Sequence, residues 1–294
     1  MDKTPDIQLA YIEPMMPTLV NRPPKGDSWF HEIKYDGYRT QIVLAGDQAR
    51  AYTRRGHDWT TRYQILVDEA RKLFGRDVHI DGELIVQDET GKPDFGKLRS
   101  SIMRGGDQLI LYAFDLLSLD GEDLRRRPCE ERRALLGELF ADVEPTCPLQ
   151  MSESYEGSAA EFFAAADQMG LEGIVSKRRD SIYESGRTTD WLKAKTFAVS
   201  EFTIVGYDRS PGSAATLLVA SEHAGKLRYA GRVMVTLSGK KREALWQSLE
   251  AREIAAPPIA ELKKKDAVWV RPELTARVRH LRGEEMLRHA TMVG

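Results

Sequence analysis

Apolar and polar positions alternate in short runs through the first two thirds of the chain, and this pattern predicts strands interleaved with helices. Strand-like runs occupy residues 38–44, 49–54, 78–87 and 109–119. Apolar residues recur at helical spacing over residues 60–74, and a capping box followed by a glycine stop indicates a second helix over residues 158–170. The prolines between Pro14 and Pro24 indicate an extended arm ahead of these elements.

The last third of the chain continues with shorter strand signals. Strand-like runs occupy residues 201–207, 215–221, 226–233 and 268–270, and a helical segment lies over residues 238–254. The length of 294 residues allows one large domain or two smaller ones, and we expect two.

The composition is that of an ordinary globular protein, with 41% hydrophobic and 30% charged residues. No apolar run approaches the ~20 residues that a membrane span needs, and the first residues carry no export or transit signal. The two cysteines, Cys129 and Cys147, lie outside any metal or redox motif. We therefore expect a reduced cytoplasmic protein that does not contact a membrane.

The net charge of −2 argues against a generally basic nucleic-acid binder. Basic residues nevertheless cluster at residues 125–127, 177–179, 263–265 and 277–282. Such clusters can form a local stripe that binds nucleic acid, or they can be ordinary solvated faces. Charge alone leaves both interpretations open.

The stretch FHEIKYDGYR, residues 30–39, contains a candidate nucleophile. Lys34 stands at the end of an apolar run, shortly before Asp36 and a glycine. An amine attacks only when it is neutral, which burial or nearby positive charge favours, and Arg39 can supply such a charge. The alternative is a solvated surface lysine beside an ordinary Asp-Gly turn. Polar clusters farther along the chain decide between the two.

Two acids stand inside apolar segments. Glu83 interrupts the predicted strand at residues 78–87, and Glu172 lies within the apolar residues 171–175. A buried acid is costly unless it is paired or bound to a cation, so both positions predict a partner. Glu83 can also lie in solvent at a strand edge.

An aromatic residue and two lysines complete the constellation. Phe114 lies in the most apolar predicted strand, where an aromatic is normally core and serves as a base-stacking platform only in a special context. Lys193 and Lys195 would point to the same face of a strand, because they are two residues apart. Phosphoryl transfer needs cations, acids that hold a metal, and a positioned attacker. Since no Walker-type or Gly-x-Gly-x-x-Gly motif is present, we expect the lysine itself to attack.

In this order the motifs closely resemble the ATP-dependent DNA ligases, and specifically the ligase module of the bacterial ligase D proteins, which work with Ku in non-homologous end joining. The resemblance runs from Glu13 to Ala290. It implies that Lys34 receives AMP and that ATP and Mg²⁺ or Mn²⁺ are the cofactors. The site residues that it implies are the catalytic Lys34, Asp36 and Arg39, the nucleotide-binding Glu32, Arg54, Glu83, Phe114, Lys193 and Lys195, and the metal-binding Glu83 and Glu172.

The same resemblance implies the fold class. It is α+β, with a nucleotidyltransferase (adenylation) domain of antiparallel sheets flanked by helices over residues 1–197. A small OB-fold β-barrel domain that binds DNA follows over residues 198–294. The implied partners are double-stranded DNA with nicks or ends, with Ku and a separate repair polymerase as candidates, for a monomer at the bacterial nucleoid.

Two departures from the family pattern stand in the last domain. Residues 231–236 read GRVMVT where family members commonly have GRVGTG, and the sequence ends at Gly294 before the family's final arginine and Asp-Lys. Only Arg288 and His289 remain of that basic neighbourhood. We expect self-adenylylation to be about a hundredfold slower, because the charge on the pyrophosphate leaving group loses one or two stabilising contacts. Sealing of AMP-capped nicks should remain ready, because that step does not expel pyrophosphate.

Two other readings remain at this point. An RNA ligase or GTP-using capping enzyme also has Lys-x-Asp-Gly, although the residues around Phe114 and the last third match it less well. A catalytically impaired DNA-end-binding module should have lost Lys34, Glu83 or Glu172, and all three are present.

Overall fold

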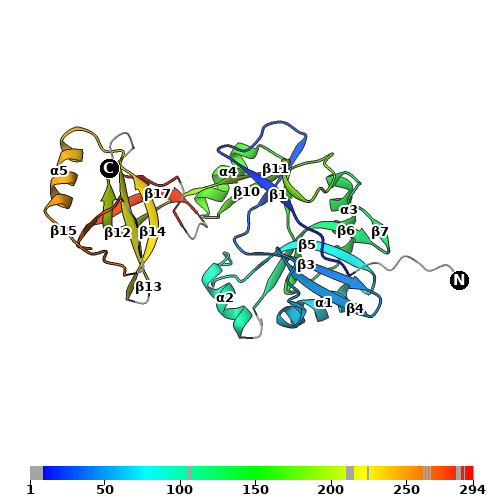
Figure 1. The fold of residues 1–294 in the computed structure, drawn as a ribbon. Coiled ribbons are helices and arrows are strands. Elements are labelled where there is room, and N and C mark those ends of the chain that lie inside the picture. The colour runs from blue at the N-terminus through cyan, green and yellow to red at the C-terminus, as the bar shows by residue number, and fades with distance from the viewer. Residues whose placement is uncertain are drawn as a thin grey trace. The chain divides into compact units, whose positions relative to one another are not determined.

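The computed structural model describes residues 9–104, 108–209, 215–223, 225–260, 262, 264, 266–282, 286–287 and 289–293. The chain forms two compact units, Met1–Lys195 and Thr196–Gly294 (Figure 1). None of the helices in the described part of the chain is long and apolar enough to cross a membrane.

One sheet of the first unit contains the strands that the alternating pattern predicted. Its order is β4-β3-β5-β6-β7, and β8 pairs with β6. The bounds are β3 (Tyr38–Ala45), β4 (Gln48–Thr53), β5 (Val78–Ile85), β6 (Ile110–Leu119), β7 (Glu122–Asp123) and β8 (Leu149–Met151). The long strands pair antiparallel, and the prediction of all four is confirmed.

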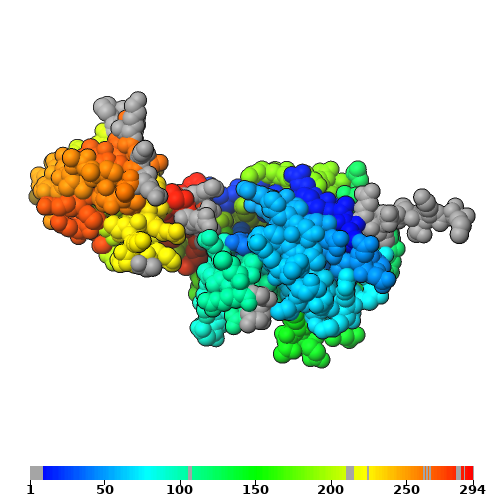
Figure 2. Space-filling model, turned by 60° about the horizontal axis from the view of Figure 1, so that its bottom comes forward, coloured from blue at the N-terminus to red at the C-terminus, as the bar shows by residue number. Residues whose placement is uncertain are grey.

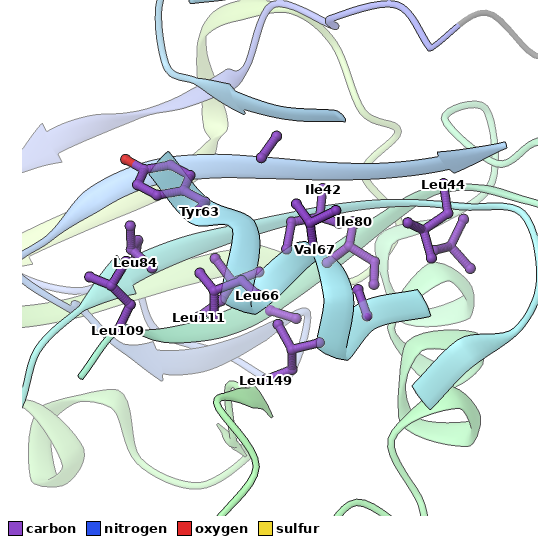
Figure 3. Packing of buried hydrophobic residues seen from close by; sticks show 14 of the residues in the cluster. Ile42, Leu44, Tyr63, Leu66, Val67, Ile80, Leu84, Leu109, Leu111 and Leu149 are labelled. Carbon is purple, nitrogen blue, oxygen red and sulfur yellow. The ribbon is translucent and has the colours of Figure 1, made fainter. Parts of the chain in front are cut away.

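The helix predicted over residues 60–74 packs on this sheet. It begins as the 3-10 turn η1 (Thr60–Tyr63) and continues as α1 (Gln64–Phe74). Figure 3 shows Leu66 and Val67 of α1 beside Ile42 and Ile80 of the sheet, within one buried cluster. Each such side chain stabilises the fold by roughly 1.5–3 kcal/mol when fully buried. Gly75 then ends the helix in the left-handed conformation, as predicted.

A second sheet of this unit has the order β1-β11-β10-β2-β9. The bounds are β1 (Met15–Val20), β2 (Trp29–Ile33), β9 (Ser154–Tyr155), β10 (Gly173–Arg178) and β11 (Gly186–Lys195). The proline-rich segment predicted as an arm therefore contains an edge strand, which pairs parallel with β11. Pro17 is accommodated because the register shifts directly after it, and edge strands tolerate the missing N–H.

Helices α2 (Phe95–Met103), α3 (Cys129–Leu139) and α4 (Ala159–Gln168) complete the first unit. The Ser158 side chain accepts a hydrogen bond from the Glu161 backbone N–H at 3.4 Å, so the predicted cap of α4 is confirmed. Helix α2 lies on the surface of the unit (Figure 2), and Met103 at its end is 89% exposed.

A buried ion pair fixes α3 to the sheet. The Arg132 guanidinium donates two hydrogen bonds of 2.8 Å to the Asp115 carboxylate of β6, and both side chains are almost fully buried. Arg132 also donates to the backbone carbonyls of Arg127 and Ser181. Removing either charge would leave the other unpaired in the interior, which is strongly destabilising.

The second unit is a barrel of the OB-fold type. Its elements are β12 (Phe197–Asp208), β13 (Thr216–His223), β14 (Lys226–Met234), α5 (Gly239–Glu250), β15 (Glu253–Ile254), β16 (Val268–Val270), β17 (Thr275–Leu281) and β18 (Thr291–Met292). The pairings run from β12 through β13, β14, β18 and β17 and back to β12, which closes the sheet. Helix α5, orange in Figure 2, lies on its surface and buries Trp246 and Leu249. The four predicted strands are confirmed. The predicted helix is confirmed as far as Glu250, but its expected end is wrong, because residues 253–254 form β15 and pair with β16.

Gly173, the first residue of β10, generates a prediction about stability. A Cβ at this position would lie 2.0 Å from the Ala194 carbonyl oxygen of β11, and its φ of +149° disfavours other residues. We expect Gly173→Ala to lower the free energy of unfolding by about 3 kcal/mol or more. Gly46→Ala is the matched control, because Gly46 has a φ of +52° but no atom near its added Cβ, and about 1 kcal/mol should be lost there. Urea unfolding midpoints test this, and equal losses in the two variants would contradict it.

Candidate active site

Lys34 directly follows β2, in the loop that leads to β3. Its backbone N–H donates a 2.9 Å hydrogen bond to the Gly173 carbonyl, so it continues the pairing of β2 with β10. Gly37 lets this loop lie against β5, because a Cβ there would be 2.2 Å from the Leu84 carbonyl oxygen. The prediction of a lysine at a strand end is confirmed, whereas the expected tight turn is an open loop with a bend at Gly37, because it connects strands of two different sheets.

The Lys34 amine is held by Glu172. Its Nζ donates a hydrogen bond to Oε2 of Glu172, and its side chain is 19% exposed. Oε1 of the same carboxylate pairs with Lys195 Nζ at 2.7 Å. Burial and the charges of Lys34 and Lys195 lower the pKa of Lys193 on the same strand, β11. Lys34 and the two β11 lysines, which are far apart in the sequence, therefore lie around one buried acid.

Glu83 lies next to this group on β5. Burial raises the pKa of its carboxyl to about 7, despite the opposing charges of Lys34 and Arg39, and the charge of Glu172 raises it further. A carboxylate with this pKa lies in an environment that favours the neutral form. The reading of Glu83 as a solvated edge residue is therefore wrong, because β5 pairs with a strand on each side and the partly buried Glu83 lies among the charges of Lys34, Arg39 and Glu172.

The Arg39 guanidinium is paired with Asp81, whereas its charge was expected to act on Lys34. Its guanidinium makes two 2.7 Å hydrogen bonds to the Asp81 carboxylate, and the Tyr183 hydroxyl donates to the same carboxylate at 2.6 Å. The positive charge expected to act on Lys34 is thus paired, and Lys193 and Lys195 supply the cations around the amine. No sequence pattern indicated Tyr183, because this residue lies outside every recognised motif and only the fold brings it to Asp81.

Phe114 of β6 lies in a buried cluster, and 8% of the residue is exposed. Arg39 Cζ and Lys177 Nζ each lie 4.4 Å from its ring centroid, and Trp191 packs against its edge. The core interpretation of this aromatic is therefore correct for the structure as described. A stacking role for the ring remains a prediction.

Glu32 of β2 is also buried and bonded. Its Oε1 accepts from Arg133 at 2.6 Å and from Lys177 at 2.9 Å. Arg133 comes from α3, and no sequence pattern indicated its role, because an arginine on a helix is normally solvated. Lys177 belongs to a basic cluster that the sequence left open, and its side chain is 2% exposed, so a solvated face is excluded for this residue.

Some expected residues contribute less to this geometry. Arg54, which follows β4, is exposed, and Asp36 is partly buried in the loop after Lys34. His289 is exposed with a left-handed φ of 50°. Arg288, Lys263 and Lys265 lie outside the described residues.

The two acids Glu83 and Glu172 suit a divalent metal that needs few protein ligands, such as Mg²⁺. In the described part of the chain, no group of three or more His, Cys, Asp or Glu side chains has a metal-binding arrangement. Mg²⁺ is commonly held by one or two carboxylates together with water and substrate phosphates, and it needs no complete protein cage. Glu83 and Glu172 supply two neighbouring carboxylates, so the residues present fit such an ion.

A nucleotidyltransferase domain followed by an OB-fold-like domain is the class of protein that this architecture defines. The chain belongs to the ATP-dependent DNA ligase family. Residues 9–195 match the family described as "ATP dependent DNA ligase domain", and residues 210–294 match "ATP dependent DNA ligase C terminal region". The family expected from the motifs is therefore confirmed, and it favours a DNA ligase over an RNA ligase or capping enzyme.

Curated relatives include the multifunctional non-homologous end joining protein LigD of Pseudomonas aeruginosa, 36% identical over 274 residues, and LigD of Mycobacterium tuberculosis, 34% identical over 266 residues. These alignments cover 90% and 87% of this chain but only 32% and 34% of the relatives, so the chain spans about a third of their length.

Solved structures with the same fold include the ligase domain of M. tuberculosis LigD, with a TM-score of 0.61 and 32% identity over 96% of this chain and 93% of that one. A mycobacterial DNA ligase D complexed with ATP has a TM-score of 0.60 at the same identity, over 95% and 93% of the two chains.

The raised pKa of Glu83 predicts a pH-dependent stability. The folded carboxyl keeps its proton up to about pH 7, whereas the ordinary value is 4.5. Between these values the folded state binds more protons, so the free energy of unfolding falls as the pH rises, by on the order of 3 kcal/mol in total. Glu83→Gln should remove this part of the slope in urea unfolding between pH 4.5 and 7.5. Glu89→Gln, at an exposed position, should leave the slope as in the wild type, and a wild-type slope in Glu83→Gln would refute the assignment.

Proposed function

We propose that this chain is an ATP-dependent DNA ligase that joins a 5′-phosphate and a 3′-hydroxyl through a lysyl-AMP intermediate. The observation that carries the proposal is the Glu172 carboxylate held between Lys34 and Lys195. An amine that attacks a phosphate must lose a proton, and a carboxylate already bonded to it can accept one. The neighbouring lysines suit the negative charge of the phosphate that is attacked.

The reaction has three steps. Lys34 Nζ attacks the α-phosphorus of ATP, an N–P bond forms, and the bond to the leaving pyrophosphate breaks. An oxygen of the 5′-phosphate of DNA then attacks the same phosphorus, which frees Lys34 and leaves AMP on the DNA. Finally the 3′-hydroxyl attacks the 5′-phosphorus, releases AMP and closes the strand. Asp36 and Arg39 follow Lys34 in the motif, and we assign Arg39 to holding Asp81 in place through their two hydrogen bonds.

The remaining residues bind the nucleotide. We assign the phosphates to Lys193, Lys195 and Arg54, the ribose to Glu83, and the adenine to Glu32 and Phe114. Glu83 and Glu172 would also hold Mg²⁺ or Mn²⁺, which would neutralise phosphate charge when bound. The partly buried Glu83 carboxyl, which lies close enough to Glu172 for the two charges to interact, supports this assignment.

The second domain, over residues 198–294, would hold the DNA, with a nicked or broken duplex as the partner. Non-homologous end joining, named in the relatives, is the process that we propose for the chain. Ku and a separate repair polymerase are the protein partners that fit this process. We propose that the chain acts as a monomer in the cytoplasm, at the bacterial nucleoid.

The first test of this function is the nucleophile. Lys34→Ala should abolish covalent labelling by α-labelled ATP on a denaturing gel, because the amine proposed to attack, which donates to Glu172 Oε2, is removed. Lys72→Ala, on an exposed face of α1, is the control and should label like the wild type. Labelling that survives in Lys34→Ala would sink the assignment.

The second test concerns the paired acid. Glu172→Gln keeps the shape of the side chain but removes the charge between Lys34 and Lys195, and we expect the labelling rate to fall on the order of a hundredfold or more. A chelator should stop labelling of the wild type as well. Glu184→Gln, at an exposed position, serves as the control. Full activity of Glu172→Gln would contradict the role of its charge, and full activity of the wild type in chelator would contradict the need for a metal.

A further inference from the structure

The Glu32 carboxylate lies on the same side of the chain as the nucleophile. Glu32 and Lys34 are two residues apart on extended backbone, because β2 continues to Lys34 through the hydrogen bond to Gly173. The side chain of Glu32 is 3% exposed, so its bonding partners decide which of its oxygens a ligand can reach.

Two cations hold one oxygen of this carboxylate. Arg133 and Lys177 both donate to Oε1, at 2.6 and 2.9 Å. Oε2 has, among the described residues, one long contact of 3.4 Å to the Ser152 hydroxyl. The carboxylate is therefore anchored through Oε1, and Oε2 keeps most of its capacity to accept a hydrogen bond.

Arg133 is the member of this group that ties separate elements together. It lies on α3, and besides Glu32 it donates to the Ser152 backbone carbonyl between β8 and β9. Its guanidinium also lies over the Phe30 ring, 5.3 Å from the centroid. A planar guanidinium with several bonds has few orientations open to it, so it fixes the direction of what it binds. Lys177, in contrast, belongs to β10, which is already paired with β2.

We propose that Arg133 is a positioning residue for base selection: it anchors Glu32 through Oε1, so that Oε2 accepts the 6-amino group of a purine. This inference rests on the proposed function, because it concerns the ATP used in self-adenylylation. An amino group donates to Oε2, whereas a 6-oxo group presents a second acceptor and is repelled. A site built to bond one such group rejects the analogue that lacks it.

The experiment compares self-labelling by α-labelled ATP and α-labelled ITP, which carries a 6-oxo group in place of the amino group. Arg133→Gln should raise the KM for ATP about tenfold with little change in the maximal rate, and should leave ITP nearly unaffected, so the ATP-to-ITP preference falls about tenfold. Arg133→Lys keeps a cation for Oε1 but loses the second bond to Ser152. Its preference should fall by about threefold.

Arg179→Gln is the matched control. Arg179 also lies over the Phe30 ring, at 6.0 Å, but its ion pairs are with Glu130 and Glu156. This variant should keep the wild-type preference. Circular dichroism melts of all variants show which of them fold.

The outcomes separate the two claims. A wild-type chain labelled by neither nucleotide would overturn the proposed function. A labelled wild type with an unchanged preference in Arg133→Gln, or with equal losses for ATP and ITP, would overturn only the role of Arg133. If Arg133→Gln does not fold, Arg133→Lys decides, because an unchanged preference in that variant contradicts the anchor.

Discussion

The carboxylate of Glu172 is the point on which the candidate site depends. It bonds Lys34, at the end of β2, and Lys195, at the end of β11, and so joins two segments that are 161 residues apart in numbering (195 − 34). The next residue must be glycine, because β11 passes too close for a Cβ. The buried Glu172 and the lack of a side chain at Gly173 therefore set the distance between Lys34 and the lysines beside it. A buried acid is tolerated here because its partners satisfy both oxygens.

The charged groups around this centre form separate pairs with distinct tasks. Arg39 and Asp81, with Tyr183, connect the two sheets of the first unit, and Arg132 with Asp115 fixes α3. Such pairs add little net stability, since desolvation offsets the attraction, but they hold their members in one orientation. That suits a site in which a nucleophile must be aligned with a leaving group. Glu83 differs because burial dominates its environment and raises its pKa.

All the residues assigned to nucleotide chemistry lie in the first unit, Met1–Lys195. The strand that carries Lys193 and Lys195 ends at the boundary, and β12 of the barrel begins two residues later. The unit proposed to carry out self-adenylylation and the barrel proposed to bind DNA are thus consecutive in the sequence. The strand that carries these two lysines is joined to β12 through Thr196 alone.

The sequence by itself determined the order of the strands, the helices α1 and α4, and the family, because alternation, caps and motif spacing are local signals. It missed β17, whose exposed Arg277 and Arg279 alternate with buried residues, because a run of charge conceals that pattern. Only the tertiary structure decided which groups the candidate site residues contact. Arg39 binds Asp81, Phe114 is covered by two cations, and Glu32 is anchored by Arg133, a residue on α3 that no motif marks. The physical reason is that motifs specify which groups are present, whereas the packing of distant elements specifies which charges can be satisfied in the interior.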